Sequence, residues 1–151
     1  MTNKSYETGI ASEFLVLSNL YRLKADAVMS MGNKKAVDIY IHWSCGRTIY
    51  VDVKSVQGTS AVPVDNIING KRKNLEDSYV VFVLYEKKFS NIQEMPSFYI
   101  VSQRELIENK DNPNYCYRSP NGLYRVHPKK HWKNSKDRWE LIVEHYPVED
   151  E

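Results

Sequence analysis

The segment Val51-Asp-Val-Lys-Ser55 constrains this chain most, because it predicts a β-strand with charged side chains inside it. Asp52 and Lys54 alternate with Val51 and Val53, so an acid and a lysine share one strand face while the other face is apolar. A buried charge is costly unless it is paired or binds a metal ion. The fold must therefore accommodate both charges. The spacing alone is weak evidence, since Glu86-Lys87-Lys88 repeats it after another apolar run.

A second acid, Asp38, lies one predicted hairpin upstream, on the polar face of the alternating segment 37–43. Two connections are open. A two-residue loop at Cys45-Gly46 would put Asp38 and Asp52 on opposite faces of the sheet. A three-residue loop ending in a left-handed Gly46 pairs Asp38 directly with Asp52. We favour the three-residue loop because it gathers all three charges on one face.

A third acid, Glu13, is predicted to lie on the first helix, over residues 5–24. Apolar residues recur there at helical spacing and are expected to face the core: Ile10, Phe14, Leu17 and Tyr21, with Val16 and Leu20 widening the stripe. Glu13 falls inside this apolar arc. A glutamate is rarely buried without a partner, so Glu13 is a candidate member of the same site.

These positions match a known pattern. Gly9-x-x-x-Glu13 on a helix, Asp38 on one strand and Asp52-x-Lys54 on the next resemble the P-D-(D/E)-x-K nuclease superfamily, with Val37 in place of the usual proline. That superfamily includes restriction endonucleases and Holliday junction resolvases. The nearer resemblance is to small bacterial proteins of this fold, and it extends over blocks along most of the chain: Gly9-Ile-Ala-Ser-Glu-Phe-Leu-Val, Gly32-Asn33, Val51-Asp-Val-Lys-Ser, Tyr79-Val-Val-Phe-Val, Phe98-Tyr-Ile-Val-Ser and Arg138-Trp-Glu-Leu-Ile.

The resemblance implies an α/β, restriction-endonuclease-like core, in which a mixed central β-sheet is flanked by α-helices. It also implies a Mg²⁺-dependent endonuclease, with Mn²⁺ as a substitute, that hydrolyses phosphodiester bonds. The expected ligands are oxygens of Asp38, Asp52, Glu13 and the Val53 carbonyl, which suit a hard cation. Lys54 would orient or deprotonate the attacking water, or offset charge at the phosphate. The alternative is a non-catalytic or partner-dependent module that binds nucleic acid or protein through the same fold.

Length and composition predict a single domain over residues 1–151. Two cysteines make no disulfide framework, and we expect Cys45 at a hairpin tip. No apolar run reaches membrane-spanning length and no signal segment is apparent, which predicts a cytoplasmic protein without a membrane partner.

The net charge of +2 is uninformative, but basic residues cluster in three places: Lys34-Lys35, Lys71-Arg72-Lys73, and Lys129 through Lys136. Each cluster can simply be a solvated surface, but we expect at least one of the three to contact nucleic acid, and the residues of the first two clusters, together with Gln57, are the named candidates. The expected partner is DNA, although an RNA-processing enzyme would use the same site. A symmetric homodimer is expected, since two nearby cuts need two single-centre subunits.

The remaining segments predict the outer elements. Residues 56–77 are expected to form a loop or a short irregular helix, and 79–85 a strand covered on both faces. A capping box at Ser102-Gln-Arg-Glu105 should open a helix. Further strands are expected near 27–31, 97–101 and 123–126, and a final short helix through 144.

Overall fold

The computed structural model describes residues 4–30, 37–70 and 74–150. The helices are α1 (Lys4–Arg22), α2 (Asp65–Ile68), α3 (Gln103–Glu108) and α4 (Pro128–His131), with 3₁₀ turns η1 (Leu75–Asp77), η2 (Lys133–Ser135) and η3 (Trp139–Leu141). The strands are β1 (Asp26–Met29), β2 (Ile39–His42), β3 (Thr48–Val56), β4 (Val62–Pro63), β5 (Ser78–Leu84), β6 (Ser97–Ser102), β7 (Tyr117–Arg118) and β8 (Tyr124–Val126).

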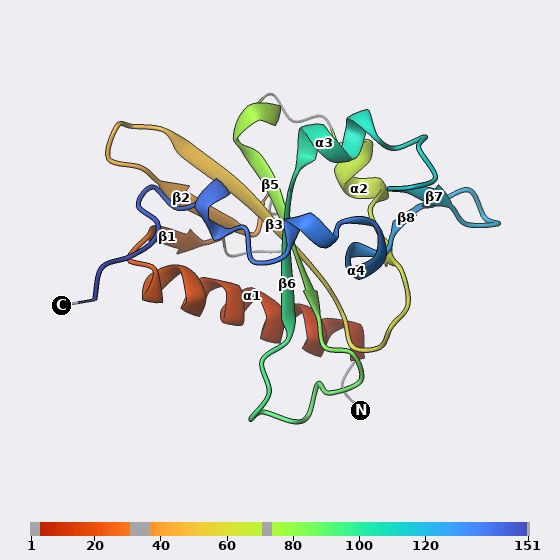
Figure 1. Ribbon diagram of the computed structural model, residues 1–151, viewed down its shortest axis with the longest axis horizontal. Helices are drawn as coiled ribbons and strands as arrows, with labels where there is room; N and C mark the ends of the chain where they lie inside the picture. The colour runs from red at the N-terminus through yellow and green to blue at the C-terminus, as the bar shows by residue number, and fades with distance from the viewer. Residues whose placement is uncertain (1–3, 31–36, 71–73, 151) are drawn as a thin grey trace.

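A five-stranded mixed sheet organises the molecule, in the order β1-β2-β3-β5-β6 (Figure 1). Neighbouring strands are antiparallel except β3 and β5, which run parallel. A parallel pair needs a crossover connection, and here it contains β4, α2 and η1. A second, three-stranded sheet has the order β4-β8-β7. The predicted mixed sheet flanked by helices is confirmed.

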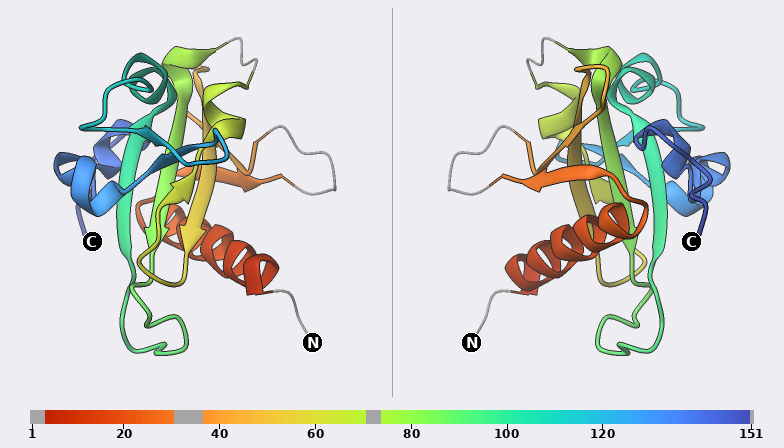
Figure 2. Two further views of the ribbon diagram at one scale, coloured as in Figure 1. Left: turned by 90° about the vertical axis from the view of Figure 1, so that its right-hand side faces the viewer. Right: turned by 90° about the vertical axis from the view of Figure 1, so that its left-hand side faces the viewer.

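The central sheet buries an apolar cluster on each face. On one side, Val16 and Leu20 of α1 pack with Ile49, Val51 and Val81. On the other side, residues of α2, α3 and the small sheet pack against β5 and β6, and they include Ile67, Phe82, Leu106, Val126 and Trp132. Figure 2 shows the small sheet crossing in front of the central strands in one view and α1 in front of them in the other. As predicted, β5 is buried along nearly its whole length.

The β2–β3 hairpin has the predicted three-residue loop. The Trp43 amide donates to the Arg47 carbonyl at 2.8 Å, and Gly46 closes the loop with φ +94°. The ladder runs from His42 opposite Thr48 to Ile39 opposite Val51. The ladder ends there, and Asp38 lies just beyond it, with its amide donating to the Val51 carbonyl at 3.2 Å. The alternative two-residue loop is excluded. Cys45 is exposed at the tip, as expected.

The first helix forms where predicted, but the side it buries differs from the expectation. Ile10, Phe14 and Tyr21 are 38%, 55% and 58% exposed, so the prediction that they pack into the core is wrong. The buried side is formed by Thr8, Ser12, Glu13, Val16 and Leu20. Two of these are small polar residues that bind other side chains across the interface. The Ser12 hydroxyl lies 2.9 Å from the Tyr85 hydroxyl, and Thr8 Oγ1 accepts from the Gln57 side-chain amide at 2.7 Å.

Most outer elements agree with the sequence. Ser102 Oγ accepts from the Glu105 amide at 3.1 Å, which confirms the N-cap of α3. The predicted C-terminal helix is only the turn η3, although Trp139, Ile142 and Val143 pack inward as expected. Strand β7 was not predicted. Within the described residues, no helix is long and apolar enough to cross a membrane.

Candidate active site at the open end of the β2–β3 hairpin

Asp38 is held at the point where the ladder between β2 and β3 ends. Its Oδ2 accepts a hydrogen bond from the Val53 amide at 2.8 Å, and its own amide donates to the Val51 carbonyl at 3.2 Å. The carboxylate therefore occupies the position of the next ladder bond. In an extended strand the N–H and C=O of one residue point to the same side. The Val53 carbonyl is thus directed to the strand edge that Asp38 flanks.

Asp52 and Lys54 lie on one face of β3, which we call the charged face. Its residues are Tyr50, Asp52, Lys54 and Val56, which pair with Ser78, Val80, Phe82 and Leu84 of β5. The opposite face, which we call the α1 face, contains Ile49, Val51, Val53 and Ser55. Asp52 is 8% exposed and Lys54 is half-buried. A buried acid is thus held in β3 where that strand pairs with β5 and its ladder with β2 has just ended, two residues from a lysine whose alkyl stem can pack over apolar neighbours.

Glu13 approaches from the other side of the sheet. It is buried, at 8% exposure, on α1, which packs against the α1 face of β3. In the described part of the chain, no group of three or more His, Cys, Asp or Glu side chains is arranged to hold a metal ion. The structure therefore joins Asp38 to Val53, the residue between Asp52 and Lys54, but it does not add Glu13 to a three-acid cluster. The role of Glu13 stays a prediction of the sequence.

The donor set at this edge suits one kind of cation. Two carboxylates, Asp38 and Asp52, and the Val53 carbonyl are hard oxygen ligands. Mg²⁺ commonly binds through one or two carboxylates while keeping waters and taking substrate phosphate oxygens. A closed tetrahedral zinc site would instead need four nitrogen or sulfur ligands. The residues present therefore fit Mg²⁺ or Mn²⁺.

The other predicted contacts fall elsewhere. Gln57 donates its side-chain amide to Thr8 and its carbonyl accepts from the Lys87 amide at 2.6 Å, so it joins the end of β3 to α1 and to the segment after β5. Its predicted contact with nucleic acid stays untested. Lys34, Lys35, Lys71, Arg72 and Lys73 lie outside the described residues.

Two aromatic residues continue the charged face toward the hairpin tip, and no role was assigned to them from sequence. Tyr40 and Tyr50 pair across the strands, with ring centroids 5.7 Å apart and planes at 73°. This edge-to-face arrangement is a favourable aromatic geometry. The pair favours the observed register next to Asp38 and Asp52, because a slip of one strand by one residue would put the two rings on opposite faces of the sheet.

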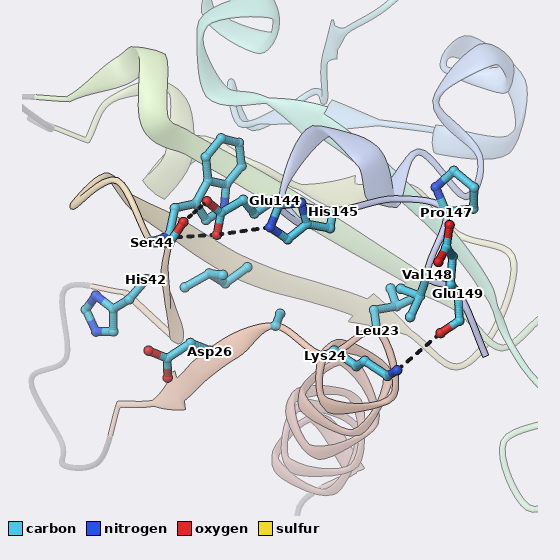
Figure 3. A pocket seen from close by; sticks show the side chains of 13 residues that line it. Leu23, Lys24, Asp26, His42, Ser44, Glu144, His145, Pro147, Val148 and Glu149 are labelled. Atoms are coloured by element: carbon cyan, nitrogen blue, oxygen red, sulfur yellow. Dashed lines mark hydrogen bonds and ion pairs between the residues drawn. The ribbon is translucent and has the colours of Figure 1, made fainter. Parts of the chain in front are cut away.

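A cavity of about 670 Å³ lies at the far end of this hairpin (Figure 3). The hairpin tip is fastened there to the C-terminal segment, since the Ser44 amide donates to Glu144 Oε2 at 2.9 Å. Hydrogen bonds from the Ser44 side chain and backbone lower the pKa of Glu144. The residues that line this cavity do not include Glu13, Asp38, Asp52 or Lys54. The cavity is therefore not the candidate active site, although it is large.

Comparison with known structures defines the fold class. The chain is similar to a bacterial homing endonuclease, I-Ssp6803I, with a TM-score of 0.59 and 14% identity over 93% of this chain and 92% of that one. It is also similar to Hjc, a Holliday junction resolvase from the archaeal hyperthermophile Archaeoglobus fulgidus, with a TM-score of 0.55 and 11% identity over 91% and 98% of the two chains.

Both of those proteins are members of the P-D-(D/E)-x-K superfamily. The restriction-endonuclease-like fold predicted from the sequence is therefore confirmed. At these identities the likeness establishes the fold. No protein-family model matches the chain, and no curated protein matches its sequence.

Proposed function

We propose that this protein is a Mg²⁺-dependent endonuclease that hydrolyses phosphodiester bonds in DNA. The observation that carries the proposal is the hydrogen bond from the Val53 amide to Asp38, which fixes an acid beside the strand that contains Asp52 and Lys54. The similar structures support it, because one is described as a homing endonuclease and the other as a Holliday junction resolvase.

Each residue has a distinct role in this proposal. Asp38, Asp52 and the Val53 carbonyl hold the ion, and the Val53 amide keeps the Asp38 carboxylate oriented toward the strand edge. When bound, Mg²⁺ supplies a water of lowered pKa and neutralises charge on the phosphate. Lys54 orients the attacking water or offsets the charge that develops on the phosphate. A lysine suits this task because it is a compact point charge on a flexible stem.

The second candidate is a module that binds nucleic acid or protein without cutting, or that cuts only with a partner. One observation favours it: across the described residues the acids do not gather into a three-carboxylate centre. In this reading Asp52 and Lys54 stabilise the sheet as a buried pair of charges. The two candidates differ in what the loss of Lys54 does to cleavage.

The test is Lys54→Ala. Linear, nicked, flapped, four-way and single-stranded DNA, and RNA, are incubated with the protein and Mn²⁺ at low salt. We expect wild type to cut at least one DNA form. Lys54→Ala should cut it at least about a hundredfold more slowly, because the lysine acts on charge that develops at the reacting phosphate. Binding should fall little, since one cation supplies a small part of phosphate affinity.

Lys88→Ala is the matched control. Lys88 belongs to another acid-x-lysine triplet, Glu86-Lys87-Lys88, and is exposed, paired with Glu94 at 2.8 Å. It should cut like wild type. Equal cleavage by wild type and Lys54→Ala would remove Lys54 from the mechanism. If wild type cuts nothing while Lys54→Ala binds like wild type, the binding module replaces the nuclease.

The predicted homodimer and cytoplasmic location remain proposals. Two nearby cuts by single-centre subunits need two copies of the chain. Light scattering coupled to size-exclusion chromatography, with and without the DNA form that is cut, should give a mass of two chains on DNA. A single chain bound to each cleaved duplex would contradict the homodimer.

A further inference from the structure

A second cavity continues the charged face of β3. Its volume is about 450 Å³, and it lies where β3 and β5 end, with Val56 and Leu84 among its lining residues. Val56 follows Lys54 by two residues on the same face, which is a distance of roughly 7 Å along a strand. A nucleic-acid backbone that passes Lys54 and continues toward the C-terminal end of β3 would therefore reach this cavity next. We call it the basic cavity.

Its rim is strongly cationic. Lys129, Lys130 and Lys133, from α4 and η2, line it together with one carboxylate, Glu86. Glu86 pairs with Lys129. Among the described residues, neither Lys130 nor Lys133 takes part in an ion pair. Two exposed ammonium groups are thus left facing an opening whose only lining acid is already paired.

His127 also lines the basic cavity. Burial lowers its pKa, and the nearby charges of His131 and Lys130 lower it further. The ring is held in place by stacking on Tyr117, at 5.7 Å between centroids and 19° between planes. The lysines belong to α4 and η2, so their backbones are ordered before an anion binds, which lowers the cost of ordering them on binding.

Part of the lining of the basic cavity is apolar. Val56 is half-buried, and Leu84 and Pro128 are buried. Thr59 and Ser60 add hydroxyl groups to the lining. A lining that combines apolar side chains with lysines and hydroxyls matches a sugar–phosphate backbone, whose sugars present carbon and whose phosphates accept from lysine and hydroxyl donors. A small free anion would make no use of the apolar residues.

We propose that the basic cavity binds the backbone of a nucleic-acid strand whose reacting phosphate lies at Lys54. This inference rests on the proposed nuclease function and names the surface that holds the strand beyond the cut. The expected ligand is a nucleic-acid strand rather than an acidic protein, because the cavity lies on the same strand face as the candidate site and is aligned with it.

The other side of β3 supplies a matched comparison. A cavity of about 510 Å³ near the same strand end is lined by Lys4, Lys87 and Lys88. It also includes Gln57, which contacts α1, so it lies on the α1 side of the sheet. It also has three lysines, and the only lining residue that it shares with the basic cavity is Gly58. Two lysines can be removed from either cavity with the same change in net charge.

The test measures binding without cleavage. In an Asp52→Asn background, fluorescently labelled single-stranded and duplex DNA are titrated with Lys130→Ala/Lys133→Ala and with Lys87→Ala/Lys88→Ala. We expect the first pair to weaken binding about tenfold near 0.1 M salt. It should also lower the slope of log K against log salt by about 1 to 2, which is roughly one unit per lost phosphate contact. The second pair should stay within about twofold of the background protein.

Three outcomes would overturn the proposal. The first is equal weakening of DNA binding by both pairs of substitutions, and the second is no weakening by the basic-cavity pair. The third comes from titrating labelled polyglutamate, an acidic polypeptide, in the same way: the basic-cavity pair weakens its binding as much as it weakens DNA binding. Melting temperatures check that the exposed-lysine variants remain folded. Because cleavage is not measured, failure of the nuclease proposal appears in a different assay. A protein that binds DNA through this cavity but never cuts would refute only the nuclease.

Discussion

The two faces of β3 differ in what they contribute. The α1 face contains Ile49 and Val51, both fully buried, and it packs against Val16 and Leu20 of the first helix. The charged face contains Asp52 and Lys54 and continues into the basic cavity. Since one face supplies the apolar burial, the other can hold charges that would be costly in a strand with two dry faces. Within the nine residues of β3, one face therefore contributes to the stability of the fold and the other carries the candidate catalytic residues.

If this separation holds, substitutions on the α1 face should change stability without changing the site. Ile49→Ala should lower the free energy of unfolding by about 2–5 kcal/mol, because it removes buried methyl groups and leaves a cavity. Ile49→Val, the conservative control, should cost about 0.5–1.5 kcal/mol. Urea denaturation measures both. DNA binding per folded molecule should match wild type, and a parallel loss of affinity would show that the two faces are coupled.

A smaller effect is expected from metal binding at the charged face. At Mg²⁺ ten times above its Kd, the folded state should gain about 1.4 kcal/mol, seen as a higher melting temperature. Asp38→Asn should abolish this gain, because it removes a carboxylate ligand while an amide oxygen can still accept from the Val53 amide. Asp26→Asn, at the cavity by the hairpin tip, is the control and should keep the gain. Equal gains in all three proteins would place the ion elsewhere.

Local patterns predicted the charged face because its determinants lie close together in sequence. Alternation put Asp52 and Lys54 on one face of β3, and the loop ending at Gly46 set the register that carries Asp38 to the edge of that strand. Both signals come from residues within one hairpin. The apolar run of β5 likewise predicted burial on both of its faces.

Local patterns did not predict which side of α1 faces the sheet. Hydrophobic periodicity gives Phe14 and Tyr21 the greatest weight, yet the helix turns Thr8 and Ser12 toward the sheet. Their hydroxyls bind Gln57 and Tyr85, which are 49 and 73 residues away. No local pattern identifies such partners. The basic cavity could not be predicted from local patterns either, because Val56, Leu84 and Lys130 are far apart in the sequence and come together only in the folded chain.

The smallest expected effect concerns His127 in the basic cavity, on the charged side of β3. Its pKa is lowered from 6.5 in the folded protein, first by burial and then by the charges of His131 and Lys130. The unfolded chain therefore takes up this proton at a higher pH than the folded protein does. As the pH falls through about 6.5, folding stability should decrease, and the decrease should level off below the folded pKa.

His127→Asn should remove this part of the pH dependence. Proton NMR of the imidazole should show the His127 pKa rising in Lys130→Ala, because one repelling charge is gone, and rising again when a DNA strand fills the cavity. Lys88→Ala, on the α1 side, should leave the titration unchanged. If DNA binds without raising the His127 pKa, the DNA does not enter the basic cavity. The charged side of β3 would then have no special role in binding nucleic acid.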